Sequence, residues 1–133
     1  GNLDVESVAV DPGTNGRASR VYAAMLWTNG TNPNDSSLYR RSGEVLVSDD
    51  KGMNWRPTGL RTQNLFLAGN GDYRVETGER LSIDPATGNI VLLGTRKNGL
   101  WRGVRDGSGN YSWSQVTSGL PAPSSLYDYA AAT

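Results

Sequence analysis

This sequence of 133 residues contains no cysteine and no histidine. Without cysteine, the chain can form no disulfide, no thiol nucleophile and no thiolate zinc site. Without histidine, it has no Ser-His pair, no imidazole base and no His-ligated metal. Any acid–base catalysis would therefore fall to carboxylates, tyrosine, lysine or arginine. We expect no metal site and no cofactor.

The sequence also lacks an excess of charge and a long apolar run. Its 13 acidic and 13 basic residues balance, so there is no electrostatic basis for binding nucleic acid or an anionic membrane. No apolar stretch approaches the roughly 20 residues of a membrane span. The first five residues do not resemble a signal peptide. The length suits one ordinary domain.

Turn-forming residues are plentiful, with 17 glycines and six prolines. No window has the 3.6-residue apolar period of a helix, and the apolar runs are short and rich in β-branched and aromatic residues. These features predict an all-β fold. The expected strands are Val5–Val10, Val21–Leu26, Gly43–Val47, Trp55–Thr58, Leu81–Ile83, Ile90–Thr95, Gly99–Val104 and Ser112–Gln115.

The expected strands form two similar units of four. An Asp-Pro pair follows the first strand of each unit, and a tryptophan stands near the last, Trp55 in one and Trp113 in the other. Tandem four-stranded units are typical of β-propellers, which close with roughly four to eight blades. We therefore predict about two four-stranded antiparallel blades of a propeller. The remaining blades would come from the same polypeptide, from other chains or from self-association.

This repeat sets the predicted domain organisation, in which two insertions interrupt an otherwise economical pattern. Long loops of this kind are frequent binding sites. The predicted parts are a blade over residues 1–60 with an inserted loop at 28–42, a connecting loop over 61–80, a second blade over 81–120, and the start of a further blade or a tail over 121–133.

The segment from Ser48 to Trp55 has the pattern Ser-x-Asp-x-Gly-x-x-Trp, which is the Asp-box turn of sialidase-like β-propellers. The Asp50 carboxylate can accept hydrogen bonds from amides of its own turn, and Gly52 can supply a positive φ. Trp55 is expected to bury its indole against the neighbouring sheet. This pattern favours a structural role for Asp50 over a catalytic one. A degenerate, longer copy of the turn is expected between Arg105 and Trp113.

Two further segments resemble family 74 glycoside hydrolases, which are xyloglucanases and related endo-β-1,4-glucanases. Thr77 to Pro85 is similar to the family's Gly-Glu-Arg-Leu-x-x-Asp-Pro element, and Gly94 to Arg102 is similar to its Gly-Thr-Arg-x-x-Gly-Leu-Trp-Arg element. The resemblance runs from about Leu3 to about Val116. It implies a fragment of the N-terminal seven-bladed propeller of a secreted, extracellular enzyme that acts on a polysaccharide.

Family 74 enzymes hydrolyse the glycosidic bond with inversion of the anomeric configuration. They use two aspartates, one from each of two propellers. The first of these lies in an Asp-x-Gly-Gly turn, which this sequence lacks, so the resemblance assigns no catalytic residue to the chain. We expect a parent protein that is an inverting glycoside hydrolase, in which this chain supplies scaffold and glycan subsites and is inactive alone. The alternative is a non-enzymatic Asp-box propeller module for binding carbohydrate or protein, or for extracellular assembly.

Aromatic side chains near the two insertions are candidates for glycan binding, because a flat ring can stack on the apolar face of a pyranose. Trp27 ends a strand and opens the first insertion, and Tyr39 and Tyr73 lie within the two insertions. Arg96 could donate hydrogen bonds to sugar hydroxyls, or form a salt bridge instead. Core packing remains an alternative for these aromatics, and we expect it for Trp101 and Trp113.

Three triplets match the acceptor pattern for N-glycosylation, beginning at Asn29, Asn34 and Asn110. Such triplets arise often by chance in loops rich in asparagine and serine. They do not decide whether the chain is glycosylated.

Overall fold

The computed structural model describes residues 2–13, 19–28, 42–62, 81–95 and 99–120. Every regular element in these ranges is a strand, and no described residue is helical. None of the described residues, accordingly, belongs to a helix of the length and apolar character that crossing a membrane requires. The eight strands are β1 (Asn2–Val10), β2 (Val21–Thr28), β3 (Ser42–Ser48), β4 (Arg56–Thr62), β5 (Leu81–Ile83), β6 (Ile90–Gly94), β7 (Leu100–Arg105) and β8 (Tyr111–Gln115).

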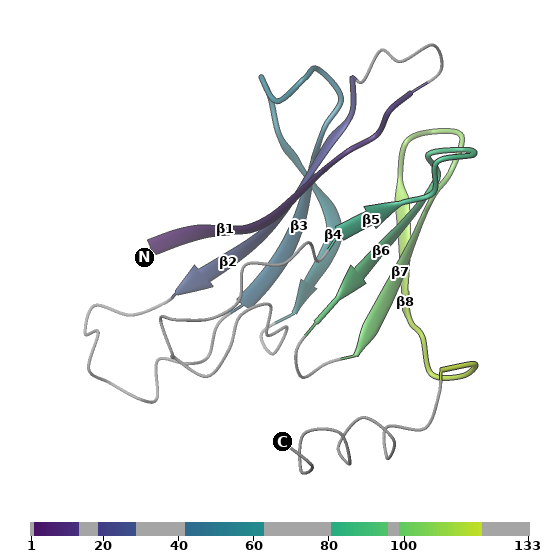
Figure 1. Ribbon diagram of the computed structural model, residues 1–133. Helices are drawn as coiled ribbons and strands as arrows, with labels where there is room; N and C mark the ends of the chain where they lie inside the picture. Colours follow the sequence, from purple (N-terminus) through teal and green to yellow (C-terminus); the bar gives the residue numbers. More distant parts are fainter. Residues whose placement is uncertain (1, 14–18, 29–41, 63–80, 96–98, 121–133) are drawn as a thin grey trace, which may run out of the picture.

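The strands form two four-stranded antiparallel sheets, with the order β1-β2-β3-β4 in the first and β5-β6-β7-β8 in the second. Each sheet is a meander in which consecutive strands pair, and Figure 1 shows the two sheets side by side. The predicted fold of two antiparallel four-stranded sheets is confirmed. The strand limits differ from the predicted ones by a few residues, most of all in β4, which continues to Thr62.

A shared hydrophobic core lies between the two sheets. Side chains alternate along a strand, so every second residue of each sheet faces the other. The fully or nearly buried residues of this core are Tyr22, Ala24, Val45, Val47 and Leu60 from the first sheet, and Leu81, Val91 and Leu93 from the second. Neither sheet could bury these residues alone, so each sheet stabilises its neighbour.

The opposite face of the first sheet carries exposed apolar side chains along β1. Val8 and Val10 are both 52% exposed. They alternate with Ala9, which packs against the core, so they point away from the second sheet. An uncovered apolar face of this kind is the feature that blade-like sheets bury against further blades.

The two ends of the sheets differ in their connections. At one end of the sheets, which is uppermost in Figure 1, β1, β3, β5 and β7 finish and β2, β4, β6 and β8 begin. We call this the turn end. At the other end β2 and β4 finish, and β3 and β5 begin, which are the boundaries of both predicted insertions. We call this the insertion end.

Candidate functional site

The turn between β3 and β4 is held by the Asp50 carboxylate and the Ser48 hydroxyl. Asp50 accepts hydrogen bonds from the Asn54 amide N–H at 2.8 Å, from the Asn54 side-chain Nδ2 at 2.7 Å and from the Ser48 hydroxyl at 2.7 Å. The Ser48 hydroxyl accepts the Gly52 N–H at 2.8 Å, and Gly52 has a φ of 89°. The Asp50 carboxylate is thus occupied within its own turn.

These hydrogen bonds lower the pKa of Asp50 to about 2, with the Asn54 backbone N–H as the largest cause. Because the folded chain favours the ionised form, the turn's contribution is present above the unfolded pKa of Asp and is lost as pH falls toward 2. We expect the melting temperature to fall between about pH 4 and pH 2, and Asp50→Asn to flatten this dependence. A wild-type profile matching that of Asp50→Asn in this range, measured by circular dichroism, would contradict the assignment.

Trp55 does not bury its indole against the neighbouring sheet, and this expectation was wrong. The side chain is exposed, with 42% of its surface accessible, and lies just before β4. Its indole N–H donates to the Gly52 carbonyl at 3.0 Å. Trp55 therefore packs on the outer side of its own turn, because its indole N–H finds a hydrogen-bond acceptor in the turn backbone.

The turn between β7 and β8 also contains an aspartate, Asp106, that accepts backbone hydrogen bonds within its own turn, although its positive φ lies at Gly109 rather than directly after the aspartate. Its carboxylate accepts the Asn110 and Ser108 amide N–H groups, each at 2.9 Å, and these bonds lower its pKa. The spacing from Asp106 to Asn110 equals that from Asp50 to Asn54, so the expected lengthening by two residues is wrong. The expectation failed because it equated Trp113 with Trp55, whereas Trp113 lies within β8 and packs against the core.

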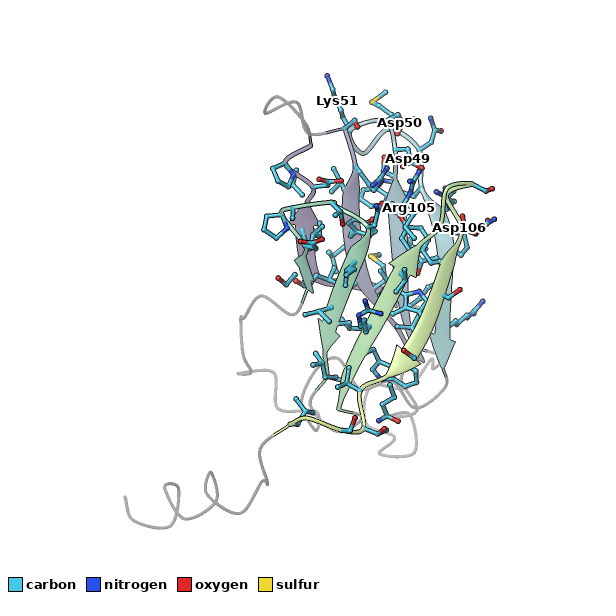
Figure 2. All side chains as sticks on the ribbon, turned by 90° about the vertical axis from the view of Figure 1, so that its right-hand side faces the viewer. Asp49, Asp50, Lys51, Arg105 and Asp106 are labelled. Carbon is cyan, nitrogen blue, oxygen red and sulfur yellow. The ribbon has the colours of Figure 1, made fainter. Side chains whose placement is uncertain are left out.

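Within the turn between β3 and β4, Asp49 binds two arginines that also contact the second sheet. It accepts from Arg20 Nε at 3.0 Å and from Arg56 Nη2 at 2.9 Å. Arg56 Nη2 also donates to the Gly109 carbonyl at 3.1 Å, and Arg20 Nη1 to the Gly88 carbonyl at a longer 3.5 Å. Partial burial alone would raise the pKa of Asp49, but the two arginines outweigh it and the pKa is lowered. Figure 2 shows Asp49 at the turn end, near Arg105 and Asp106 of the other sheet.

We expect Asp49→Asn to lower the free energy of unfolding by about 1 kcal/mol. The neutral amide keeps the shape but loses two charge-assisted hydrogen bonds, and the figure is kept low because the carboxylate is 45% exposed and screened by solvent. Urea unfolding of Asp49→Asn, Arg56→Gln and the double variant measures the coupling between the two residues. Strictly additive losses would contradict the pairing.

Below this cluster, two hydrogen bonds between side chains connect the sheets. The hydroxyls of Tyr22 and Tyr111 lie 2.8 Å apart, and their rings meet edge to face with centroids 5.9 Å apart. The indole N–H of Trp113 donates to the Thr58 hydroxyl at 3.2 Å. Polar and aromatic side chains at the turn end therefore connect the two sheets, and we call this set of contacts the polar joint.

The residues predicted to bind glycan fall on the insertion end or outside the described part of the chain. Trp27 lies in β2, in register with Leu3 of β1 and Ser42 of β3, one residue before the strand ends. Tyr39, Tyr73 and Arg96 lie outside the described residues. The strand ends that flank their segments all belong to the insertion end. Topology therefore attaches these segments to one end of the sheets.

Sequence reasoning missed Arg20, Asp49 and Arg56, which form the polar joint. It also missed Glu44, a carboxylate that is only 5% exposed near the insertion end. An acidic residue within β3, directly before the apolar run Val45–Val47, was the available signal for Glu44. Within the described ranges, no three acidic residues gather as metal ligands would.

Comparisons with known proteins agree with this geometry. The chain is 41% identical over 127 residues to "Xyloglucanase Xgh74A" of Acetivibrio thermocellus, a match that covers 93% of the chain and 13% of that protein. It is 34% identical over 119 residues to "Xyloglucanase" of Hypocrea jecorina, covering 88% of the chain and 12% of that protein. The crystal structure of the GH74 enzyme of Niastella koreensis superposes with a TM-score of 0.58 and 27% identity, over 87% of the chain and 15% of that structure. No family model matches the sequence.

Two four-stranded antiparallel meanders packed face to face place the chain in the class of β-propeller blades. More particularly, the chain is homologous to a segment of the family 74 glycoside hydrolases, over most of its own length. It spans about one eighth of the length of the xyloglucanases that it matches.

Proposed function

We propose that this chain is the blade scaffold of an extracellular xyloglucan-type β-glucan hydrolase, and that its insertion end contributes glycan subsites. The observation that carries the proposal is the 41% identity to a xyloglucanase across 93% of the chain. Such continuous similarity, rather than a shared turn motif alone, ties these blades to proteins named for hydrolysis of xyloglucan.

The division between the two ends supports the placement of the subsites. At the turn end, Asp49 uses its carboxylate on Arg20 and Arg56, and the hydroxyls of Tyr22 and Tyr111 bond to each other. The insertion end holds the terminus of β2, where Trp27 lies, and the strand ends that flank the segments of Tyr39, Tyr73 and Arg96. Aromatic platforms at that end would bind the apolar faces of glucose units.

No carboxylate of the described residues is proposed as catalytic. Asp50, Asp84 and Asp106 accept backbone hydrogen bonds in their own turns, and Asp49 holds arginines. An inverting hydrolase needs an acid and a base about 6.5–9.5 Å apart with a water between them. We propose that the catalytic pair comes from other blades of the protein, in agreement with the missing Asp-x-Gly-Gly turn.

The test is binding and hydrolysis of xyloglucan oligosaccharides by the full-length protein that contains this chain. We expect Trp27→Ala to weaken binding about tenfold or more, since losing a stacking platform costs roughly 1–3 kcal/mol in the comparable case of nucleobases. Trp55→Ala is the matched control, because it removes an exposed indole from the opposite end and should leave binding unchanged.

Equal losses for the two variants would remove Trp27 from the subsites. If the full-length protein binds but does not cleave, the non-enzymatic carbohydrate-binding module replaces the hydrolase. If it neither binds nor cleaves, the proposal as a whole is overturned.

A further inference from the structure

The turns that contain Asp50 and Asp106 differ in how they use the asparagine four residues after the aspartate. In the first turn, the side-chain Nδ2 of Asn54 donates to the Asp50 carboxylate at 2.7 Å. In the second turn, the Asn110 backbone N–H donates to the Asp106 carboxylate at 2.9 Å, and the Asn110 carbonyl accepts the Asp106 N–H at 2.8 Å. Among the described residues, however, the Asn110 side-chain amide has no hydrogen-bond partner.

The position two residues after the asparagine also differs between the turns. In the first turn it is Arg56, whose guanidinium binds Asp49 and the Gly109 carbonyl in the polar joint. In the second turn it is Ser112, whose hydroxyl bonds to no other residue of the described ranges. The first turn therefore uses both side chains to hold the structure, whereas the second turn leaves the amide and the hydroxyl available.

These two available groups form an acceptor pattern for N-linked glycan, Asn110-Tyr111-Ser112. Asn110 and Ser112 are both exposed, at the end of the turn and in the first residues of β8, the last strand of its sheet. A glycan is bulky and hydrophilic, so it needs an attachment point that faces solvent. Asn110 offers such a point while its backbone stays fixed by the bonds to Asp106.

The place of Asn110 in the fold also separates it from the proposed glycan subsites. It lies in the turn between β7 and β8, at the turn end of the sheets. The triplets that begin at Asn29 and Asn34 lie outside the described residues, in the segment that joins β2 to β3 at the insertion end. A glycan on Asn110 would therefore leave the insertion end open to a polysaccharide.

We propose that Asn110 is an acceptor site for an N-linked glycan. In the transfer, Asn110 Nδ2 forms a bond to C1 of the first sugar of a lipid-diphosphate-linked oligosaccharide. The bond between C1 and the diphosphate oxygen breaks, the lipid diphosphate leaves, and Nδ2 gives up one proton. The proposal rests on the extracellular location proposed above, because such triplets are modified in secreted proteins.

The test uses the full-length protein, secreted from a host whose export pathway attaches N-linked glycans, with peptide mapping by mass spectrometry. We expect the wild-type peptide that contains Asn110 to carry a glycan that peptide-N-glycosidase removes. Ser112→Ala should abolish this modification, because the acceptor pattern requires a hydroxyl at that position, and Ser112→Thr should keep it. Ser114→Ala is the matched control, since it removes the same hydroxyl from another exposed position of β8.

The peptide that contains Asn54 should stay unmodified in the same protein. An unmodified Asn110 in secreted wild-type protein overturns the proposal. So does an equal loss of the glycan in Ser112→Ala and Ser114→Ala, or a glycan found only on protein that circular dichroism shows to be unfolded. Hydrolysis of xyloglucan by the same preparation tests the proposed function separately. Active protein without a glycan on Asn110 overturns the acceptor site alone, and glycosylated protein that neither binds nor cleaves overturns the proposed function alone.

Discussion

Replacing Tyr22 by alanine is expected to lower the free energy of unfolding by roughly 3–5 kcal/mol, the range for removing a large aromatic side chain from a core. Tyr22 is completely buried and belongs to the core shared by the two sheets. Its truncation leaves a cavity and also removes the hydrogen bond to the Tyr111 hydroxyl. Urea unfolding monitored by tryptophan fluorescence measures the change.

Tyr22→Phe is the matched control for this prediction, because it keeps the ring and removes only the hydroxyl. We expect it to cost about 1 kcal/mol, the usual net value of one hydrogen bond. Burial, followed by the bond to Tyr111, raises the pKa of Tyr22, so the hydroxyl stays protonated in the folded chain until pH is well above the usual tyrosine value. A loss for Tyr22→Ala no larger than that for Tyr22→Phe would show that the two sheets do not share this core.

The second large effect is expected from Gly103→Ala, which adds one methyl group beneath an indole. Gly103 lies opposite Trp113 in the β7–β8 pairing, and an added Cβ would meet three ring atoms of Trp113 at 2.8–2.9 Å. The indole would have to move and give up its hydrogen bond to Thr58 of the first sheet. Overpacking of this kind costs roughly 1–3 kcal/mol.

Gly107→Ala provides the control, since a Cβ at that position meets nothing within 4 Å. We expect it to change stability by less than about 0.5 kcal/mol, as surface substitutions usually do. The same unfolding experiment serves both variants. Similar losses of stability for Gly103→Ala and Gly107→Ala would mean that the Trp113 ring does not pack directly against the β7 backbone at Gly103.

The strands could be predicted from the sequence because each one is bounded by local signals. Asp-Pro pairs, Gly-Asn turns and the Asp-box pattern act within a few residues, and the structure places a turn at each of them. The arrangement in two sheets could also be predicted, because the four-strand pattern occurs twice and the strands of a meander pair in sequence order.

The joint between the sheets could not be predicted in this way. Arg20 and Gly88 are 68 residues apart, Arg56 and Gly109 are 53 apart, and Tyr22 and Tyr111 are 89 apart. No spacing rule connects such positions, and each pairing depends on the rotation of one sheet against the other. The role of Trp55 was missed for a related reason, since whether an indole turns inward or back onto its own turn depends on one hydrogen bond.

Arg20 and Arg56 of the first sheet bind the second sheet through the backbone carbonyl oxygens of Gly88 and Gly109. Every amino acid has such a carbonyl. The second sheet can therefore change its side chains at these contacts without losing its half of the attachment. Duplicated blades that dock in this manner are free to diverge in sequence, provided that the path of the main chain is kept. Such tolerance offers a physical reason why blades of one ring can become so unlike each other and still assemble.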